Sequence, residues 1–181
     1  MTATDGAESP RARIREHVRR NPGVHFNRLV RALDLAPGQV QHHLRALGDE
    51  VRADSLYGRT HYYPPGTDAW ERGALALLRR ETAREVVRAV LVDDLAEPAE
   101  VAEAAGVARS TLEWHLDRLT EREVLEKRYA DDGSVTLHAV RQVELARLLA
   151  TVDPSPSDRL VDRFDRLLDD LLLDARGDRD A

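Results

Sequence analysis

The chain has 181 residues and a mass of 20.3 kDa, enough for one ordinary domain or two small ones. Apolar residues make up 42% of it, so a packed core is expected; the absence of cysteine excludes disulfides, thiolate nucleophiles and thiolate metal sites. The first ten residues lack the basic-then-apolar order of a signal peptide, and no apolar run approaches the ~20 residues that span a bilayer. We therefore expect a soluble, cytoplasmic protein with no membrane partner.

The formal net charge of -6 would by itself disfavour a nucleic-acid partner, but the charge is unevenly distributed. Residues 11–66 carry ten arginines against five acidic residues, whereas residues 67–140 carry nine arginines and Lys127 against sixteen. Residues 141–181 carry seven arginines against ten acidic residues. The basic charge is thus concentrated in the first third of the chain, as expected for a domain that contacts phosphates.

Taken in chain order, residues 1–10 are predicted to be disordered and the first helix to run from Arg11 to Arg20, where Asn-Pro-Gly stops it. A short apolar-periodic helix ends at Asp34, and a second helix begins three residues later. That helix, Pro37 to Leu47, places apolar residues at i, i+4 and i+7 on one face. A β-hairpin with strands at 51–55 and 60–63 is expected next. Two short helices joined by a tight turn predict a helix-turn-helix.

The same order of elements recurs later in the chain. Residues 29–47 align without a gap to residues 101–119 at an offset of 72, and five positions are identical: Ala32, Ala36, His43, Leu44 and Leu47 match Ala104, Ala108, His115, Leu116 and Leu119. A helix is predicted at 82–92 before the second pair, and a hairpin at 124–129 and 134–139 after it, with Asp-Gly in its turn. The sequence therefore predicts two modules in tandem.

Two further segments lie outside the modules. Pro64-Pro65-Gly66 is predicted to be a linker, followed by a helix over residues 68–79. At the C-terminus, a predicted helix over residues 157–174 places Val161, Phe164, Leu168 and Leu171 at heptad a and d positions. It either dimerises the chain or covers the second module, and we favour dimerisation. The predicted divisions are a disordered N-terminus (1–10), a basic module (11–66), a linker helix with an acidic module (67–140), and C-terminal helices (141–181).

This order of elements, with the segments QHHLRAL and EWHLDRL, resembles winged helix-turn-helix transcription regulators of the arsenic-repressor-like and multiple-antibiotic-resistance-like type, found in archaea and bacteria. It resembles most closely the archaeal regulators built from two such modules. The resemblance covers residues 11–140 and implies a mainly α fold with small β-hairpin wings. It also implies DNA binding, more often with repression than activation. The family often has Ser or Thr where Ala36 and Ala108 begin the recognition helices, so another group must cap them, and Gln39 could do so in the first module.

The predicted DNA-reading surface lies in the first module, on the helix from Pro37 to Leu47 and the hairpin tip at residues 56–60. Gln pairs well with adenine and Arg with guanine in the major groove, and a glycine lets the backbone approach phosphates. Arginines on the preceding helix and on the wing suit phosphates or the minor groove. The predicted DNA-binding residues are Arg28, Arg31, Gly38, Gln39, Gln41, His42, Arg45, Arg52, Arg59 and His61.

The second module offers a weaker reading face, because Glu113 and Asp117 would repel phosphates and Asp131-Asp132 occupies its hairpin tip. We expect it to serve protein contact, with secondary DNA or partner contacts at Arg109, Ser110, Trp114 and Arg118. Whether Trp114 is an exposed contact or packs against the wing is left open.

No metal site or cofactor is expected, because His42 and His43 lie ~100° apart on a helix and His43 and His115 are interpreted as packing residues. No phosphate-binding loop, nucleophile elbow or HExxH motif is present, so no enzyme activity is expected.

The sequence thus predicts a dimeric, sequence-specific regulator of transcription that binds double-stranded DNA and contacts the transcription machinery. The alternative is a winged-helix scaffold that binds proteins and reads no DNA. Only Lys127 among the 27 basic residues is a lysine, and together with the abundant aspartate this favours a salt-adapted, halophilic archaeal source over a merely GC-rich genome.

Overall fold

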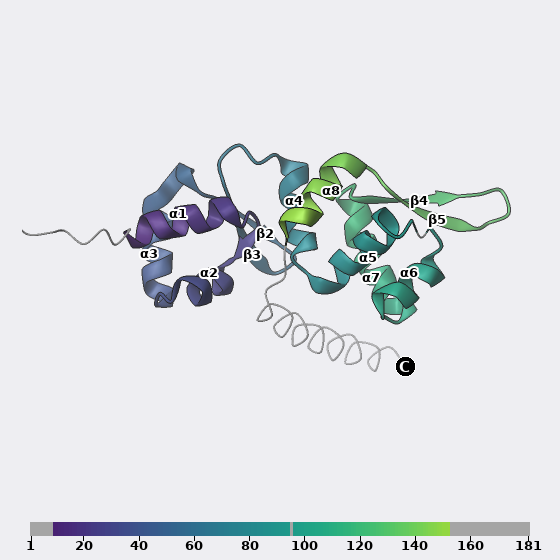
Figure 1. Cartoon of the computed structure of the whole chain (residues 1–181), viewed down its shortest axis with the longest axis horizontal. Coiled ribbons are helices and arrows are strands. Elements are labelled where there is room, and N and C mark those ends of the chain that lie inside the picture. The colour runs from purple at the N-terminus through teal and green to yellow at the C-terminus, as the bar shows by residue number, and fades with distance from the viewer. Residues whose placement is uncertain (1–8, 95, 153–181) are drawn as a thin grey trace, which may run out of the picture. The chain divides into compact units, whose positions relative to one another are not determined.

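The computed structural model describes residues 9–94 and 96–152 (Figure 1). The fold is mainly helical, with small antiparallel sheets. The chain divides into two compact units, residues 1–76 and 77–181. The junction falls within helix α4 (Ala69–Leu78), later than the boundary predicted at residue 66. Within the described part of the chain, no helix is both long and apolar enough to cross a bilayer.

The first unit consists of three helices and a small sheet. Its elements are α1 (Pro10–Arg20), β1 (Val24–His25), α2 (Phe26–Leu33), α3 (Pro37–Leu47), a 3-10 turn (Gly48–Glu50), β2 (Arg52–Leu56) and β3 (Arg59–Tyr63), followed by α4. The strands pair antiparallel in the order β1-β3-β2. This is the helix, helix, turn, helix and hairpin order that the sequence predicts.

Local chemistry explains where the helices begin and end. The Ser9 hydroxyl accepts a hydrogen bond from the Ala12 N–H at 3.2 Å, and Pro10 begins α1 with a fixed φ that suits a first helical position. The predicted disorder is therefore wrong at residue 10, while residues 1–8 lie outside the described part. Asp34 ends α2 in the left-handed conformation with φ of 51°, as expected for its position before the turn.

The core of the first unit forms where the apolar faces of α1, α2 and α3 meet. Its buried residues are Ile14, Val18, Val24, Leu29, Leu33, Val40, Leu47 and Val51. Leu44, Phe26, Val30, Leu35 and Tyr62 pack against this cluster while remaining partly exposed. Because Val40, Leu44 and Leu47 turn inward, the opposite face of α3 is left to solvent.

The described part of the second unit has three helices, then a two-stranded hairpin and a further helix. Its elements are α5 (Glu81–Leu91), α6 (Pro98–Ala105), α7 (Arg109–Glu121), β4 (Leu125–Tyr129), β5 (Val135–Ala139) and α8 (Gln142–Thr151). Gly106 ends α6 in the left-handed conformation with φ of 65°, the conformation that Asp34 has at the end of α2. The Leu137 N–H donates to the Ala96 carbonyl at 2.8 Å, so a residue two positions before α6 is hydrogen-bonded to the hairpin. The predicted helix over residues 157–174 lies outside the described residues.

Candidate nucleic-acid interface

The outward face of α3 has the composition predicted for it. Gly38, Gln39, Gln41, His42 and Arg45 are all exposed, and a Cβ at Gly38 would meet nothing within 4 Å. Pro at the start of α3 and the apolar i, i+4, i+7 spacing set both the bounds of the helix and its orientation. The helix therefore presents an unobstructed polar ridge to solvent.

Gln39 has a structural role that restricts what it can contact. Its Oε1 accepts a hydrogen bond from the Ala36 N–H at 3.1 Å, which confirms that Gln39 caps a helix whose N-cap residue has no polar side chain. A bidentate contact with adenine needs both the amide oxygen and the amide nitrogen of glutamine. In this position Gln39 has only its Nε2 to offer, so Gln41 is the better candidate for that contact.

Arg45 and Arg52 are free to bind a ligand. Both are exposed, and in the described ranges no ion pair or hydrogen bond engages either guanidinium. Arg45 lies in the last turn of α3, and Arg52 begins β2, the edge strand of the hairpin. By contrast, Arg11 and Arg15 of α1 are both paired with Glu50, at 2.7 and 2.8 Å. Two guanidinium groups of this unit that have no partner in the described residues therefore lie at the end of α3 and at the start of the hairpin.

Three of the predicted phosphate contacts influence the charge state of one imidazole, that of His25. His25 lies opposite His61 in the β1–β3 pairing, with their ring centroids 6.5 Å apart, and Arg28 and Arg31 follow His25 along α2. Burial lowers the pKa of His25 to about 3, and the positive charges of Arg59, His61, Arg31 and Arg28 add to that effect. His25 is thus neutral at ordinary pH. The positive charges of Arg28 and Arg31 on α2 and of Arg59 on the hairpin all act on this imidazole.

His61 is not a surface residue of the wing, and its prediction as a DNA contact is wrong. Only 2% of the side chain is exposed, and its Nδ1 lies 2.8 Å from the Gly23 carbonyl, to which it must donate. The reason is β1, which the sequence did not predict: pairing with Val24 and His25 makes β3 the central strand and turns His61 inward. His61 holds the turn between α1 and β1.

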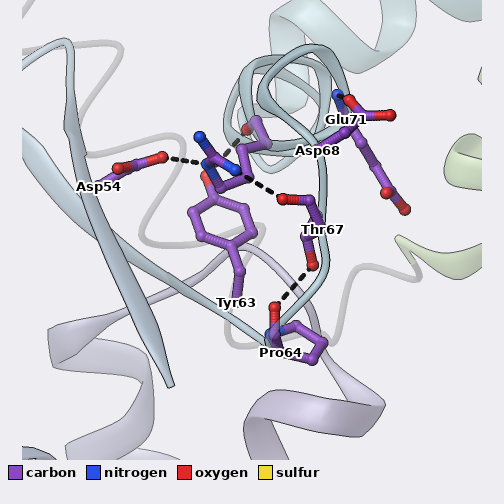
Figure 2. A network of polar contacts seen from close by, with 7 residues as sticks. Asp54, Tyr63, Pro64, Thr67, Asp68 and Glu71 are labelled. Carbon is purple, nitrogen blue, oxygen red and sulfur yellow. Dashed lines mark hydrogen bonds and ion pairs between the residues drawn. The ribbon is translucent and has the colours of Figure 1, made fainter. Parts of the chain in front are cut away.

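A polar network fixes the hairpin to the segment that follows it (Figure 2). The Arg72 guanidinium is ion-paired with Asp54 of β2 and donates to the Thr67 carbonyl at 2.5 Å. The Tyr63 hydroxyl donates to the Arg72 carbonyl at 2.8 Å. The sequence did not predict that Arg72 holds the hairpin in place. In the pattern of α4, Arg72 is only one polar residue on a helix, and nothing local indicates its contact with Asp54.

The tip of the hairpin is a two-residue turn formed by Tyr57 and Gly58, both with positive φ, at 50° and 78°. Such a turn matches the twist of the strands but favours Asn-Gly, because a residue with a Cβ is strained there. The loop predicted from the sequence, residues 56–59, is two residues wider than this turn, so Tyr57 was not predicted to occupy a strained position. The strand ends, Leu56 and Arg59, are paired directly across the turn.

In the second unit the corresponding helix face is engaged by internal contacts. Glu113 is paired with Lys127 of β4 at 2.8 Å, and the Arg118 guanidinium stacks over the Trp114 ring at 3.2 Å from its centroid. Arg80 approaches the same ring at 5.8 Å. Trp114 is half-buried, and these two arginines lie over its ring. Arg109 and Ser110, at the start of α7, are exposed.

The histidines do not assemble a metal site in the described part of the chain. No group of three or more His, Asp or Glu side chains there is placed to hold an ion. His115 is 7% exposed and His43 half-buried, as expected for packing residues. The predicted dimerisation residues Val161, Phe164, Leu168 and Leu171 lie outside the described residues.

Comparison with known proteins identifies the first unit only. Residues 8–75 match a family described as an N-terminal HTH domain, so this part of the chain is a helix-turn-helix domain. No curated protein matches the sequence. Among solved structures, the crystal structure of ScpB from Mycobacterium tuberculosis is 19% identical with a TM-score of 0.29, covering 79% of this chain and 98% of that one. Similarity at this level supports no functional inference.

Proposed function

We propose that this protein is a transcription regulator that binds double-stranded DNA in a sequence-specific manner through its first unit. The observation that carries the proposal is the outward face of α3, which is polar and exposed and ends in the uncommitted Arg45. A single α-helix fits the major groove, where Gln41, His42 and Arg45 would meet base edges. The match to an HTH domain supports DNA as the partner.

The hairpin and α2 would supply the contacts to the DNA backbone. The positive charges of Arg28, Arg31 and Arg59 all act on His25, and Arg52 is exposed at the start of β2 with no ion pair or hydrogen bond in the described residues. Contacts of this kind set the position of a protein on the duplex and make its affinity fall as salt is added. The Asp54–Arg72 ion pair holds the hairpin at a fixed place for this purpose.

The second unit is proposed to be a second winged helix module that contacts proteins. Its order of elements and the Ala96–Leu137 hydrogen bond parallel those of the first unit. Glu113 and Arg118 on α7 are engaged inside the unit, and this favours a role other than reading bases. Arg109 and Ser110 remain exposed for a partner in the transcription machinery. We expect no enzymatic activity.

A homodimer would pair two reading helices on an inverted repeat. Half-sites would then lie about one helical turn of DNA, or a multiple of it, apart. The alternative function, a scaffold that binds proteins only, is favoured by the engaged face of α7 but does not explain why Arg45 and Arg52 are left without partners in the described residues.

The decisive experiment selects binding sites from a pool of random duplexes with the full-length protein and then measures affinity by mobility shift. Arg45→Ala should relax the preference at one base pair and cost about tenfold or more in affinity. Arg52→Ala should weaken binding to all sequences alike and lower the salt dependence. Arg109→Ala, an exposed arginine in the second unit, is the matched control and should leave affinity unchanged. No enriched sequence, or equal effects of all three variants, would contradict the proposal.

A further inference from the structure

The hairpin of the second unit has one edge in use and one edge open. Figure 1 shows β4 and β5 extending past the helices of their unit. The Leu137 N–H of β5 donates to the Ala96 carbonyl at 2.8 Å, so the outer edge of β5 has a backbone partner. In the described residues no strand other than β5 pairs with β4, and this leaves the outer edge of β4 as the open side of the sheet.

The alternation of backbone hydrogen bonds shows which groups lie on this open edge. The Val140 N–H donates to the Val124 carbonyl at 3.2 Å, so the even-numbered residues of β4 turn their backbone groups towards β5. Because successive residues of a strand alternate, the odd-numbered residues turn their N–H and C=O groups outward. These are Leu125, Lys127 and Tyr129, and within residues 9–94 and 96–152 no backbone partner meets their outward groups.

A groove follows the open edge of β4. Its volume is about 510 Å³, and β4 contributes side chains from both of its faces to the wall, so the groove lies beside the strand and not on one face of the sheet. Tyr129 is 73% exposed and Val140 is 43% exposed, and both line it. An open strand edge bordered by exposed apolar side chains is a template on which a further strand can pair.

The side chains of β4 are ordered so that the strand complements itself. In an antiparallel pair of β4 strands with a two-fold axis at Lys127, Glu126 of each copy lies opposite Arg128 of the other. Leu125 then lies opposite Tyr129, and the three outward-facing residues all exchange backbone hydrogen bonds across the axis. Moving the axis to Glu126 or to Arg128 would place that charged residue opposite its own copy. Charge therefore selects one register.

The central lysine does not oppose this pairing. Lys127 would lie opposite its own copy, but it is turned towards α7 and paired with Glu113 at 2.8 Å, so its charge is already compensated within each chain. Glu126 and Arg128 form an exposed ion pair within one chain and would join four alternating charges across the axis. Opposite charges directly across two strands stabilise their pairing.

We propose that β4 is the dimerisation surface of this protein and pairs antiparallel with β4 of a second copy, in the order β5-β4-β4-β5. A second copy fits better than an unrelated extended peptide, because the charge pattern of the strand matches itself in a single register. The inference names the interface of the homodimer proposed above and to that extent rests on the proposed function. All its residues belong to the second unit, so it can be tested without DNA.

Charge exchange in the full-length protein tests the pairing, with self-association measured by sedimentation velocity over a range of concentrations. Glu126→Arg and Arg128→Glu each place like charges opposite one another across the axis, and each should weaken the dimer about tenfold or more. An equimolar mixture of these two variants should recover the wild-type affinity, because their heterodimer again has opposite charges across the axis. Arg88→Glu, which breaks an exposed ion pair with Glu85 on α5 of the same unit, is the control and should leave association unchanged.

Recovery in the mixture supports the proposal, since neither variant chain regains its own ion pair between residues 126 and 128; circular dichroism confirms that each variant is folded. A wild-type chain that stays monomeric at every concentration would overturn it. A dimer that both variants leave intact, or a loss that mixing does not reverse, would overturn it as well. Selection of DNA sites by a monomeric chain would reject this interface and leave the DNA-reading role of α3 standing.

Discussion

The Arg72 network offers the sharpest test of how the hairpin is positioned. Replacing Arg72 with Met keeps most of the aliphatic stem but removes the ion pair with Asp54 and the hydrogen bond to the Thr67 carbonyl. The side chains of Arg72 and Asp54 are only 14% and 29% exposed, so the abandoned carboxylate would be poorly hydrated. Since two charge-assisted hydrogen bonds contribute ~1.5 kcal/mol each, the free energy of unfolding of Arg72→Met should fall by about 3 kcal/mol.

The loss of stability caused by Arg72→Met should be detected as earlier unfolding of the first unit. For a unit of this size, ~3 kcal/mol corresponds to a fall in Tm of about 10 °C or more. The chain has two tryptophans, Trp70 in the first unit and Trp114 in the second. In a Trp114→Phe background, the fluorescence of Trp70 therefore reports unfolding near the network, in urea or on heating.

A double-mutant cycle isolates the ion pair. Arg72→Met, Asp54→Asn and the double variant should give a coupling free energy of about 1–2 kcal/mol, since each single change leaves a partner unsatisfied. A coupling free energy below about 0.3 kcal/mol would refute the reasoning, because additive effects mean that the two side chains act independently. Glu16→Gln, which affects an exposed ion pair with Arg19 on α1, is the control and should change stability little.

Four further predictions concern single features. Tyr57→Asn should raise the free energy of unfolding by about 1 kcal/mol in urea titrations, since asparagine tolerates positive φ better; no gain would show that the turn is unstrained. Gln39→Ala should cost about 0.5–1 kcal/mol and Gln39→Glu much less, because only the latter keeps the cap; equal losses would contradict the capping role. With the folded-state pKa of His25 near 3 and an unfolded value near 6.5, the unfolded chain binds the extra proton, so the His25 contribution should lower stability as pH falls through that window; NMR titration showing His25 charged at pH 5 would contradict this. If the chain is salt-adapted, its Tm should fall steeply below about 0.5 M salt, and a flat response would remove that interpretation.

Local patterns were enough to predict the elements that carry the site. The bounds of α3 are as predicted because Pro37, the apolar spacing and Gly48 all lie within or beside the helix they define. The outward face of α3 follows from that same spacing, and so could be derived without knowledge of any tertiary contact. The cap made by Gln39 is likewise a contact over three residues.

The features that the sequence did not predict, the burial of His61 and the Arg72–Asp54 ion pair, depend on contacts between residues far apart in sequence. A two-residue strand such as β1 is too short to show any periodicity, and without it β3 looks like an edge strand with His61 outside. Arg72 and Asp54 are 18 residues apart, on a helix and a strand whose packing no local pattern indicates. These long-range contacts decide which polar residues are buried and which remain for a ligand.

The outward face of α3 also has a consequence for how such a protein can diversify. Gln41 and Arg45 take no part in the core or in capping, whereas Val40 and Leu47 are buried and Gln39 is a cap. On the function proposed for α3, changes at positions 41 and 45 should therefore alter the preferred base sequence at almost no cost in folding free energy. Duplicated copies of this chain could acquire new target sites by substitutions at these positions while keeping one scaffold.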